Sequence, residues 1–195
     1  MSRPGDSIAS VLQPSPFRPV TAWLTGMSGA GKSTLASRAV RRLVDHGHRA
    51  VCLDGDVLRE GLNANLGFGP EGRAEAVRRA GEAAMLLCGA GVFPVVALIS
   101  PYAADRDCVR ARHASHDFGF LEVFVDAPVA VLESRDPKGL YARARRGEIA
   151  DFTGISDPYE APRRPDLHLR TDASPEEDCV ESLVGAILEA SRRGR

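Results

Sequence analysis

The sequence has no strong excess of either charge and no long apolar run. Its 25 lysine and arginine residues nearly balance 26 aspartate and glutamate residues, so with a net charge of −1 there is no overall basic field to attract nucleic acid. No stretch approaches the ~20 apolar residues of a membrane-spanning helix, and residues 1–19 lack the apolar core of a secretory signal peptide. These absences predict a soluble cytoplasmic protein that binds neither nucleic acid nor a membrane.

Cysteine is scarce and follows no recognisable pattern. The four cysteines, Cys52, Cys88, Cys108 and Cys179, form no C-x-x-C pair and have no zinc-ligand spacing. Cys52 and Cys88 lie in apolar runs and are expected to be buried as small hydrophobic side chains, as in a reducing cytoplasm. A chain of 195 residues can bury about 70% of its unfolded surface, so it needs no disulfide or metal to fold as one domain.

A glycine-rich segment at residues 26–33 is the most informative feature that is present. It reads GMSGAGKS and matches the phosphate-binding pattern G-x-x-x-x-G-K-[ST] between a β-favouring segment at 20–25 and a helical pattern at 34–43. In this context the backbone N–H groups and the helix N-terminus hold phosphate, Lys32 reaches the β- and γ-phosphates, and Ser33 ligates Mg²⁺. The alternative, a glycine-rich turn with a chance lysine, does not explain the flanking strand and helix. The predicted nucleotide-binding residues are Gly26, Ser28, Gly29, Ala30, Gly31, Lys32, Ser33 and Thr34.

Strands and helices alternate after this loop. Apolar runs predict strands at 50–53, 92–99 and 120–126, and helical patterns cover 72–88 and 105–116. The predicted fold is α/β, a P-loop NTPase-type parallel sheet sandwiched by helices, with a flexible tail at 1–18 and a kinase domain at 19–195. Ligands bind beyond the carboxyl ends of such strands. The candidate positions there are Thr25, Gly26, Asp54, Gly55, Asp56, Ser100 and Asp126.

Residues 135–160 depart from this alternation. The segment is first basic and then rich in glycine, proline and turn residues. In a phosphate-transfer protein such a segment is typical of a lid that closes over the substrates and excludes water. A solvated surface helix followed by a loop is the alternative interpretation.

Phosphoryl transfer needs a phosphate cradle, a metal, a group that orients the acceptor hydroxyl, and cations for the developing charge. Asp54 and Asp56 follow the second predicted strand and are candidates for the metal shell and the acceptor hydroxyl, although D-G-D also forms ordinary turns. The chain has no N-K-x-D guanine motif and is short for a motor or transporter ATPase. A small-molecule kinase fits both its length and its predicted lid.

Six segments together resemble the adenylyl-sulfate (APS) kinase family over about residues 20–170. They lie at 26–33, 53–56, 66–68, 99–102, 135–141 and 152–162, and R-D-P-K-G-L-Y and F-T-G-I are the most specific. The resemblance implies ATP-dependent phosphorylation of the 3′-hydroxyl of adenosine 5′-phosphosulfate (APS), giving 3′-phosphoadenosine 5′-phosphosulfate (PAPS) and ADP. It also implies ATP and Mg²⁺ as cofactors, a homodimer, and ATP sulfurylase as a possible partner.

The resemblance also implies roles for individual residues. Phe68 and Phe152 would sandwich the adenine of APS, and Lys138 would lie near the transferring phosphate. Ser100 matches a serine sometimes assigned as a phosphoserine intermediate, but direct in-line transfer does not need one, and a strand-end residue whose backbone lines the site is the favoured alternative. Ser33 and Asp56 would hold the metal. The residues expected to bind the dianionic phosphosulfate are Arg59, Arg73 and Arg78.

The chain departs from the family pattern around the acceptor. Val57 and Ala76 stand where the family has asparagines, Ala103 stands in place of an arginine, and Gly72 in place of an aspartate. A site that loses such groups loses discrimination. The acceptor is therefore APS bound more weakly or a related hydroxyl-bearing metabolite. A non-catalytic nucleotide-binding partner is the remaining alternative, but retention of Lys32, Asp56 and Lys138 argues against it.

Overall fold

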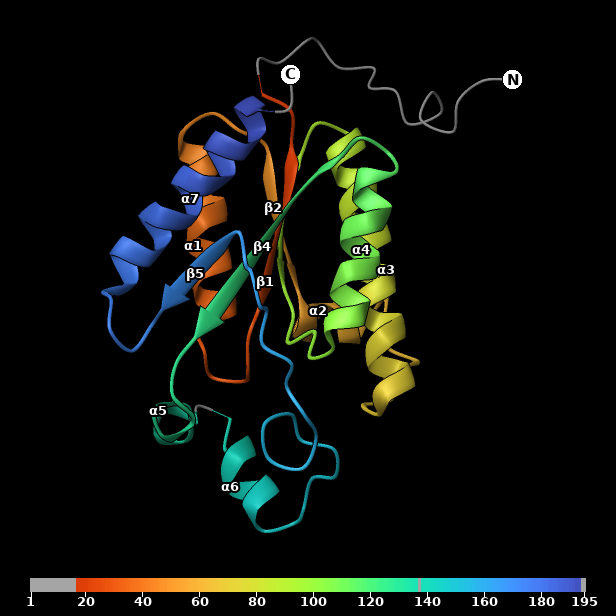
Figure 1. Cartoon of the computed structure of the whole chain (residues 1–195), viewed down its shortest axis with the longest axis vertical. Helices are drawn as coiled ribbons and strands as arrows, with labels where there is room; N and C mark the ends of the chain where they lie inside the picture. Colours follow the sequence, from red (N-terminus) through yellow and green to blue (C-terminus); the bar gives the residue numbers. More distant parts are fainter. Residues whose placement is uncertain (1–16, 137, 194–195) are drawn as a thin grey trace.

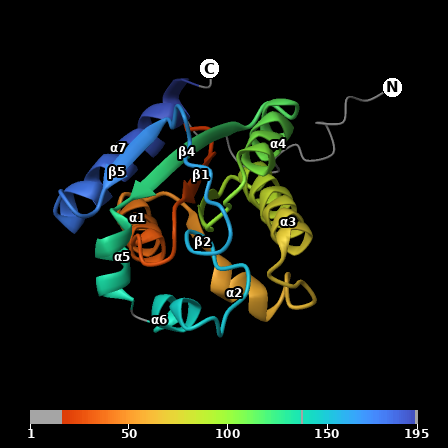
Figure 2. The same ribbon diagram turned by 60° about the horizontal axis from the view of Figure 1, so that its bottom comes forward.

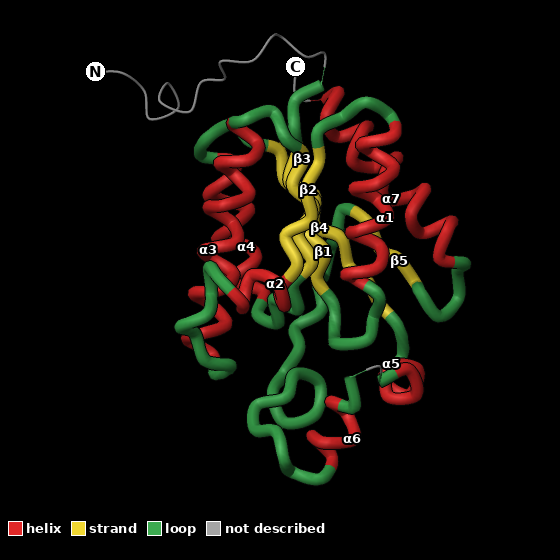
Figure 3. Tube along the Cα trace, turned by 180° about the vertical axis from the view of Figure 1, so that it is seen from behind, coloured by secondary structure: helices red, strands yellow, loops and turns green. Residues whose placement is uncertain are grey.

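The computed structural model describes residues 17–136 and 138–193 of the chain. Its centre is a five-stranded, fully parallel sheet with strand order β2-β3-β1-β4-β5. The sheet lies between the helices in Figure 1 and Figure 3. The P-loop strand β1 is central and pairs with β3 and β4. The strands are β1 (Val20–Thr25), β2 (Ala50–Asp54), β3 (Phe93–Ala97), β4 (Gly119–Asp126) and β5 (Leu167–Arg170).

Helices cover both faces of the sheet (Figure 1). Helices α1 (Lys32–Asp45) and α7 (Glu176–Arg193) pack on one face, and α3 (Pro70–Gly89) and α4 (Ala103–Ala114) on the other. Successive residues of β1 point to opposite faces, so Leu24 joins the larger core cluster under α1 and α7 while Trp23 joins the cluster under α3 and α4. All six residues of β1 are buried, as expected for the central strand of a sheet covered on both sides.

Three short helices lie near the carboxyl ends of the strands. They are α2 (Gly55–Glu60), α5 (Val129–Arg135) and α6 (Leu140–Arg145), and Figure 2 shows them grouped at one end of the molecule. The carboxyl ends of the strands point toward this end of the molecule. The start of β1 and the end of α7 lie at the opposite end (Figure 1). The sheet therefore presents its strand ends to these short elements, where a parallel sheet binds ligands.

The predicted strands and long helices are confirmed, with boundaries shifted by a few residues. Helices α2, α5 and α7 and strand β5 were not predicted. Residues 1–16 of the predicted tail lie outside the described part of the chain, and the boundary at residue 18 stays a prediction. The ring of Phe17 packs 4.8 Å from that of His48, and the Arg18 N–H donates to the carbonyl oxygen of Ser191 at 3.3 Å.

The sheet–helix interface beneath α3 and α4 contains a small polar cluster. The Nδ1 of His113 lies 2.8 Å from the carbonyl oxygen of Val109, so Nδ1 carries the hydrogen and Nε2 accepts from the Thr21 hydroxyl at 2.9 Å. The Cys88 thiol lies 3.5 Å from the same hydroxyl. Burial lowers the pKa of His113 and raises that of Cys88 to about 11, so both groups are held neutral.

Within the described residues all four cysteines are free, with Cys88 buried and Cys52 half-buried, which agrees with their predicted role as packing residues. No helix in the same part of the chain is long and apolar enough to cross a lipid bilayer.

Candidate active site

A cavity of about 1070 Å³ opens at the carboxyl ends of the strands. Its wall is built from the P-loop, α2, the start of α3, the turn after β3 and the predicted lid, with the turn between β5 and α7 closing one side. Figure 2 looks onto this end of the molecule. The volume lies at the upper end of the usual range for ligand pockets, about 300–1,000 Å³, so there is room for more than one small ligand.

The P-loop curls because glycine occupies the positions where no side chain fits. Gly26 has φ 151°, and a Cβ there would lie 2.1 Å from the carbonyl oxygen of Val125. Ser28, Gly29, Gly31, Ser33 and Thr34 line the cavity together with Lys32. Gly26 and Ala30 are not among the described lining residues. Gly26 shapes the turn, and the side chain of Ala30 is buried in the core.

The ammonium group of Lys32 is folded back onto its own loop. Its Nζ donates to the carbonyl oxygens of Gly26 and Met27, each at 2.8 Å. Burial lowers the pKa of Lys32 to about 8, opposed by the nearby Asp54 and Asp56 carboxylates and assisted by Lys138. An anion bound in the loop would therefore favour the protonated form of Lys32 and attract its ammonium group away from the two carbonyl oxygens.

The D-G-D sequence forms the start of α2. The Asp54 carboxylate accepts from the Asp56 N–H at 2.9 Å and so caps the helix, and both aspartates line the cavity. Asp56 forms an ion pair with Lys138 of the predicted lid. Residues 82 positions apart thus meet at one wall of the cavity. Their roles in catalysis stay predictions.

The oxygen ligands in this wall suit Mg²⁺. Ser33, Asp54 and Asp56 offer a hydroxyl and two carboxylates, and Mg²⁺ is usually held by one or two carboxylates plus substrate phosphates and water. Within the described residues there is no group of three or more histidine, cysteine, aspartate or glutamate side chains that could hold a metal. The residues present therefore fit a magnesium ion that arrives with nucleotide.

The opposite wall combines cations with aromatic rings. The Arg59 guanidinium lies 4.1 Å from the ring centre of Phe68, which is 65% exposed, and burial together with the nearby Arg73 lowers the pKa of Arg59. Arg73 donates to the carbonyl oxygen of Phe68 at 2.6 Å and to the hydroxyl of Thr153 at 2.7 Å. Phe152 also lines the cavity. Arg73 also forms an ion pair with Asp157 at 3.8 Å. The two arginines of this wall together offer N–H donors and positive charge to an anion.

Arg78 does not belong to this wall, which corrects the prediction made for it. Its guanidinium pairs with Glu75 at 2.7 Å, its side chain is 60% exposed, and it lines a separate groove between α3 and α4. The reason is the phase of the helix, since five residues turn a helix by about 140° between Arg73 and Arg78. The family pattern fixed the spacing of these arginines without showing which side of α3 each one takes.

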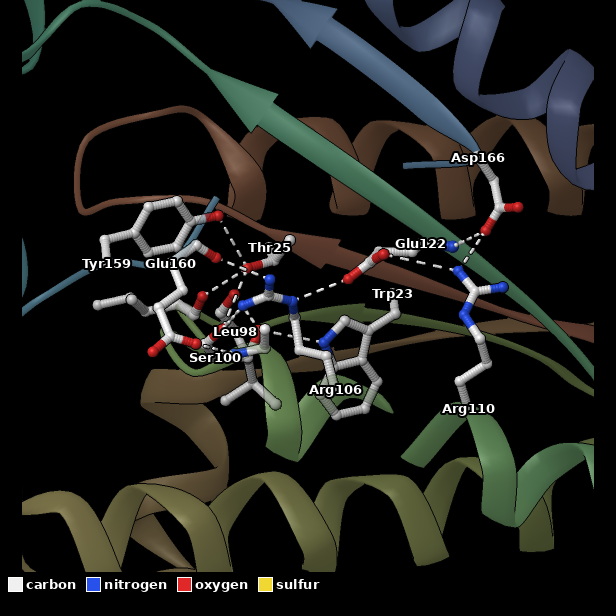
Figure 4. A network of polar contacts seen from close by, with 12 residues as sticks. Trp23, Thr25, Leu98, Ser100, Arg106, Arg110, Glu122, Tyr159, Glu160 and Asp166 are labelled. Atoms are coloured by element: carbon white, nitrogen blue, oxygen red, sulfur yellow. Dashed lines mark hydrogen bonds and ion pairs between the residues drawn. The ribbon is translucent and has the colours of Figure 1, made fainter. Parts of the chain in front are cut away.

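Ser100 lines the cavity through the turn after β3, but its hydroxyl is engaged elsewhere. The residue is 3% exposed with φ 40°, and its Oγ accepts from the indole N–H of Trp23 at 3.1 Å (Figure 4). Of its two predicted roles, the geometry favours the strand-end residue whose backbone lines the site over the phosphoserine intermediate. The strand-end candidate Asp126 instead faces His168 at 3.2 Å.

The departures from the family pattern are not equivalent in space. Among the described residues that line the cavity only Ala76 is one of them, while Val57 is 64% exposed outside it and Ala103 donates its N–H to Glu160. Gly72 allows a close approach, because a Cβ there would lie 2.4 Å from the carbonyl oxygen of Gly67. Of the four departures, therefore, only Ala76 changes the described lining of the cavity.

The structure adds residues that the sequence did not single out. Arg135 donates to both the hydroxyl and the carbonyl oxygen of Thr171, and Thr171 donates to the carbonyl oxygen of Ala30. Arg135, Thr171 and Ser174 line the side of the cavity next to the P-loop helix. Tyr141 of α6 donates to the carbonyl oxygen of Ser28 at 3.0 Å. Arg135 lies in a segment already recognised as family-specific, whereas β5, which precedes Thr171, gave no clear pattern.

Comparison with known proteins decides the family. The model of the adenylylsulphate kinase family matches residues 18–170. The chain belongs to the adenylyl-sulfate kinase family. An adenylyl-sulfate kinase from Paraburkholderia xenovorans is 51% identical over 178 residues, which cover 91% of this chain and 98% of the relative.

Structural comparison agrees with this membership of the APS kinase family. The Mycobacterium tuberculosis APS kinase CysC, solved in complex with AMPPNP and APS, aligns with a TM-score of 0.82 and 48% identity over 87% of this chain and 99% of its own. The family domain also occurs within longer chains. The bifunctional enzyme NodQ of Azospirillum brasilense is 49% identical over 167 residues, which are 86% of this chain but 27% of NodQ.

Proposed function

We propose that this protein transfers the γ-phosphoryl group of ATP to the 3′-hydroxyl of APS, giving PAPS and ADP. The observation that carries the proposal is one cavity that contains both a complete P-loop and a separate anion-binding wall with an exposed phenylalanine. Membership of the APS kinase family supports the identity of the acceptor.

The donor side is formed by the P-loop. Its backbone N–H groups and the N-terminus of α1 hold the β- and γ-phosphates, and Lys32 leaves its two loop carbonyls to neutralise charge on the transferring group. Ser33 and Asp56 would hold Mg²⁺, which supplies charge neutralisation at the phosphates when bound. This preorganised electrostatic field is the main contribution that a protein makes to phosphoryl transfer.

Asp56 and Lys138 act on the acceptor hydroxyl and the phosphoryl group. In the ligand-free protein the two side chains neutralise each other. When both substrates are bound, Asp56 accepts the proton of the acceptor's 3′-hydroxyl. The 3′-oxygen forms a new bond to the γ-phosphorus of ATP, and the bond between the γ-phosphorus and the β-phosphate oxygen breaks, which releases ADP. Lys138 then balances the negative charge that gathers on the transferring group.

The remaining wall recognises the acceptor. Arg59 and Arg73 bind the phosphosulfate through charge-assisted hydrogen bonds, and Phe68 and Phe152 stack on the adenine. The exposure of Phe68 in the ligand-free protein suits this role, because the bound base would cover an apolar ring now facing solvent.

The direct test is ADP formation by the purified protein with Mg-ATP, measured with and without APS. We expect ADP release that depends on APS, and replacing Arg73 by glutamine should raise the KM for APS by about tenfold or more, since each charge-assisted bond contributes about 1.5–3 kcal/mol. Absence of APS-dependent ADP formation by the parent protein would leave only a kinase for another metabolite or a non-catalytic nucleotide-binding protein.

Arg78→Gln is the matched control for Arg73→Gln. Both arginines lie on α3, but the Arg78 guanidinium pairs with Glu75 outside the cavity. We expect the Arg78 variant to keep the parent KM for APS. A rise in KM equal to that of the Arg73 variant would restore the prediction made from the family pattern and contradict the acceptor wall described above.

The finer assignments belong to the same proposal. Mg²⁺ as the metal is supported by the oxygen donors of Ser33, Asp54 and Asp56. A homodimer, association with an ATP sulfurylase and a cytoplasmic location stay predictions from the family resemblance and the composition.

A further inference from the structure

Arg106 is a buried arginine outside the residues assigned to substrate binding. Its side chain is 2% exposed, and each of its three guanidinium nitrogens has a partner (Figure 4). Nε donates to Glu122 of β4 at 2.8 Å, Nη1 to the carbonyl oxygen of Ser100 at 2.7 Å, and Nη2 to the carbonyl oxygen of Glu160 at 2.7 Å. One side chain of α4 thus ties together three separate parts of the chain.

The two carbonyl partners belong to two walls of the active site. Ser100 lies within the turn after β3, which forms part of the cavity wall, and Glu160 ends the lid segment 135–160. Glu160 is held further by its own N–H, which donates to Pro101, and by its carboxylate, which accepts from the N–H of Ala103. The trailing end of the lid is therefore fastened to the turn that forms the wall.

A second link joins the same two parts to the P-loop strand. Thr25, the last residue of β1, donates to the carbonyl oxygen of Ile99 at 2.7 Å and accepts from the hydroxyl of Tyr159 at 3.0 Å (Figure 4). Burial raises the pKa of Tyr159 to about 12, so its hydroxyl keeps the proton that it donates. The network thus runs from α4 to the residue that precedes the P-loop.

We propose that Arg106 is a positioning residue for phosphoryl transfer, which fixes the trailing end of the lid against the turn after β3 and so sets the acceptor half of the cavity. The inference rests on the proposed function. Phe152 and Thr153 of the lid lie eight and seven residues before Glu160 and contact the acceptor wall, Thr153 through Arg73. A shift at Glu160 would be transmitted to them, while the P-loop would keep its own contacts.

An ion pair with Glu122 alone would not need these contacts. Glu122 also lies 3.6 Å from Arg110, which pairs with Asp166 at 2.6 Å, so a cation already faces this carboxylate from α4. What Arg106 adds is a planar guanidinium that donates to two main-chain carbonyls at once, which a point charge such as lysine does not reproduce. The distinction between positioning and charge pairing can therefore be tested.

The test uses a double variant, Arg106→Met with Glu122→Leu. Removing both charges avoids leaving a buried carboxylate unpaired, and replacing a buried ion pair by apolar side chains is often neutral for stability. We expect the KM for APS to rise and kcat to fall, each on the order of tenfold or more, because small displacements of positioned groups have effects of that size. The dissociation constant for ATP should stay that of the parent, since the P-loop is not altered.

Arg110→Gln is the matched control, because Arg110 faces the same carboxylate but contacts neither Ser100 nor Glu160 in the described structure. It should retain the parent kinetics. Hydrogen exchange of residues 157–160 gives a readout that does not require APS, and exchange should be faster in the double variant than in the parent or the Arg110 variant. Arg106→Lys keeps a cation beside Glu122 and is the substitute test if the double variant fails to fold. It should change the KM for APS, kcat and the exchange rate in the same directions.

The possible failures are distinguishable. A parent protein that binds ATP but shows no APS-dependent activity would remove the proposed function while leaving the exchange measurement intact. An active parent whose double variant, or failing that its Arg106→Lys variant, keeps the parent KM, kcat and exchange would overturn the positioning role. Arg106 would then be a structural ion-pair partner only.

Discussion

At the scale of the residue, the ligand-free position of Lys32 has a measurable consequence. Its pKa is lowered to about 8 because burial removes the ammonium group from water. A bound triphosphate adds negative charge beside the ammonium group, which favours the protonated form and raises that pKa. Binding of ATP should therefore be coupled to proton uptake at the upper end of the physiological pH range.

We expect uptake of about half a proton per ATP near pH 8, where Lys32 is half neutral without ligand, and much less at pH 6.5, where it is already charged. Titration calorimetry in two buffers of different ionisation enthalpy measures this number. Lys32→Arg is the control, since arginine stays protonated throughout this range. Equal proton uptake by the parent and the arginine variant would show that another group is responsible.

Individual site residues were predictable where a motif fixes the backbone as well as the residue type. The P-loop residues and Asp54 and Asp56 are of this kind, because a glycine loop and a strand end leave their neighbours little choice of direction. Arg78 and Ser100 show the limit. A helix turns by about 100° per residue, and a hydroxyl takes whichever donor or acceptor lies near it, here the indole of Trp23, which no local pattern reveals.

At the scale of the element, the lid is held at identifiable points. Tyr141 contacts the P-loop carbonyl of Ser28, Arg73 bonds the carbonyl oxygen of Asp151 and the hydroxyl of Thr153, and Arg106 bonds Glu160. The ion pairs of the intervening arginines are more local, because they reach only Glu148 or the neighbouring α5. The predicted lid is thus fastened at its trailing end and near its start.

This distribution predicts two exchange regimes within the lid. Amides of residues 142–150 should exchange faster than those of 152–160 in the ligand-free protein, and should become protected when ATP and APS bind together. Hydrogen exchange with mass spectrometry measures both, and residues 120–126 of the central sheet provide a slow internal reference. Slow exchange over 142–150 that neither ligand changes would contradict the assignment of a lid.

Helix α7 and strand β5 were not predicted, for two different reasons. Helix α7 has an apolar stripe of Val180, Leu183, Val184 and Ile187 at helical spacing, all buried, so its signal was present but lay beyond the family-specific motifs. Strand β5 has only four residues, in which Leu167 and Leu169 alternate with His168 and Arg170. A pattern this short and half polar cannot be told from a loop in the sequence. Its place at the sheet edge comes from pairing with β4, a long-range contact.

At the scale of the whole molecule, His113 links stability to pH. Its folded pKa lies below the ordinary value because burial disfavours the charged ring. Below about pH 6.5 the unfolded chain therefore binds a proton that the folded chain does not, and stability falls as the pH falls. His48 has a pKa lowered mainly by burial as well, so its contribution has the same sign.

We expect the free energy of unfolding to decrease between pH 7 and pH 5, by up to about 1.4 kcal/mol per pH unit from His113, with a smaller contribution from the more exposed His48. Urea unfolding at several pH values measures the slope. His113→Gln should be less stable at pH 7, because the buried hydrogen bonds are disturbed, but should show a shallower slope. An unchanged slope in this variant would assign the pH dependence to other groups.

The first and last described residues have an architectural consequence through their distance from the cavity. The Arg18 N–H bonds to Ser191, so the start of β1 and the last turns of α7 lie together, at the pole away from α5 and α6 (Figure 1). A protein module joined at either point would leave the mouth of the cavity and the predicted lid unobstructed. The geometry thus makes this fold a portable unit, suited to covalent fusion with a second catalyst without redesign of its own chemistry.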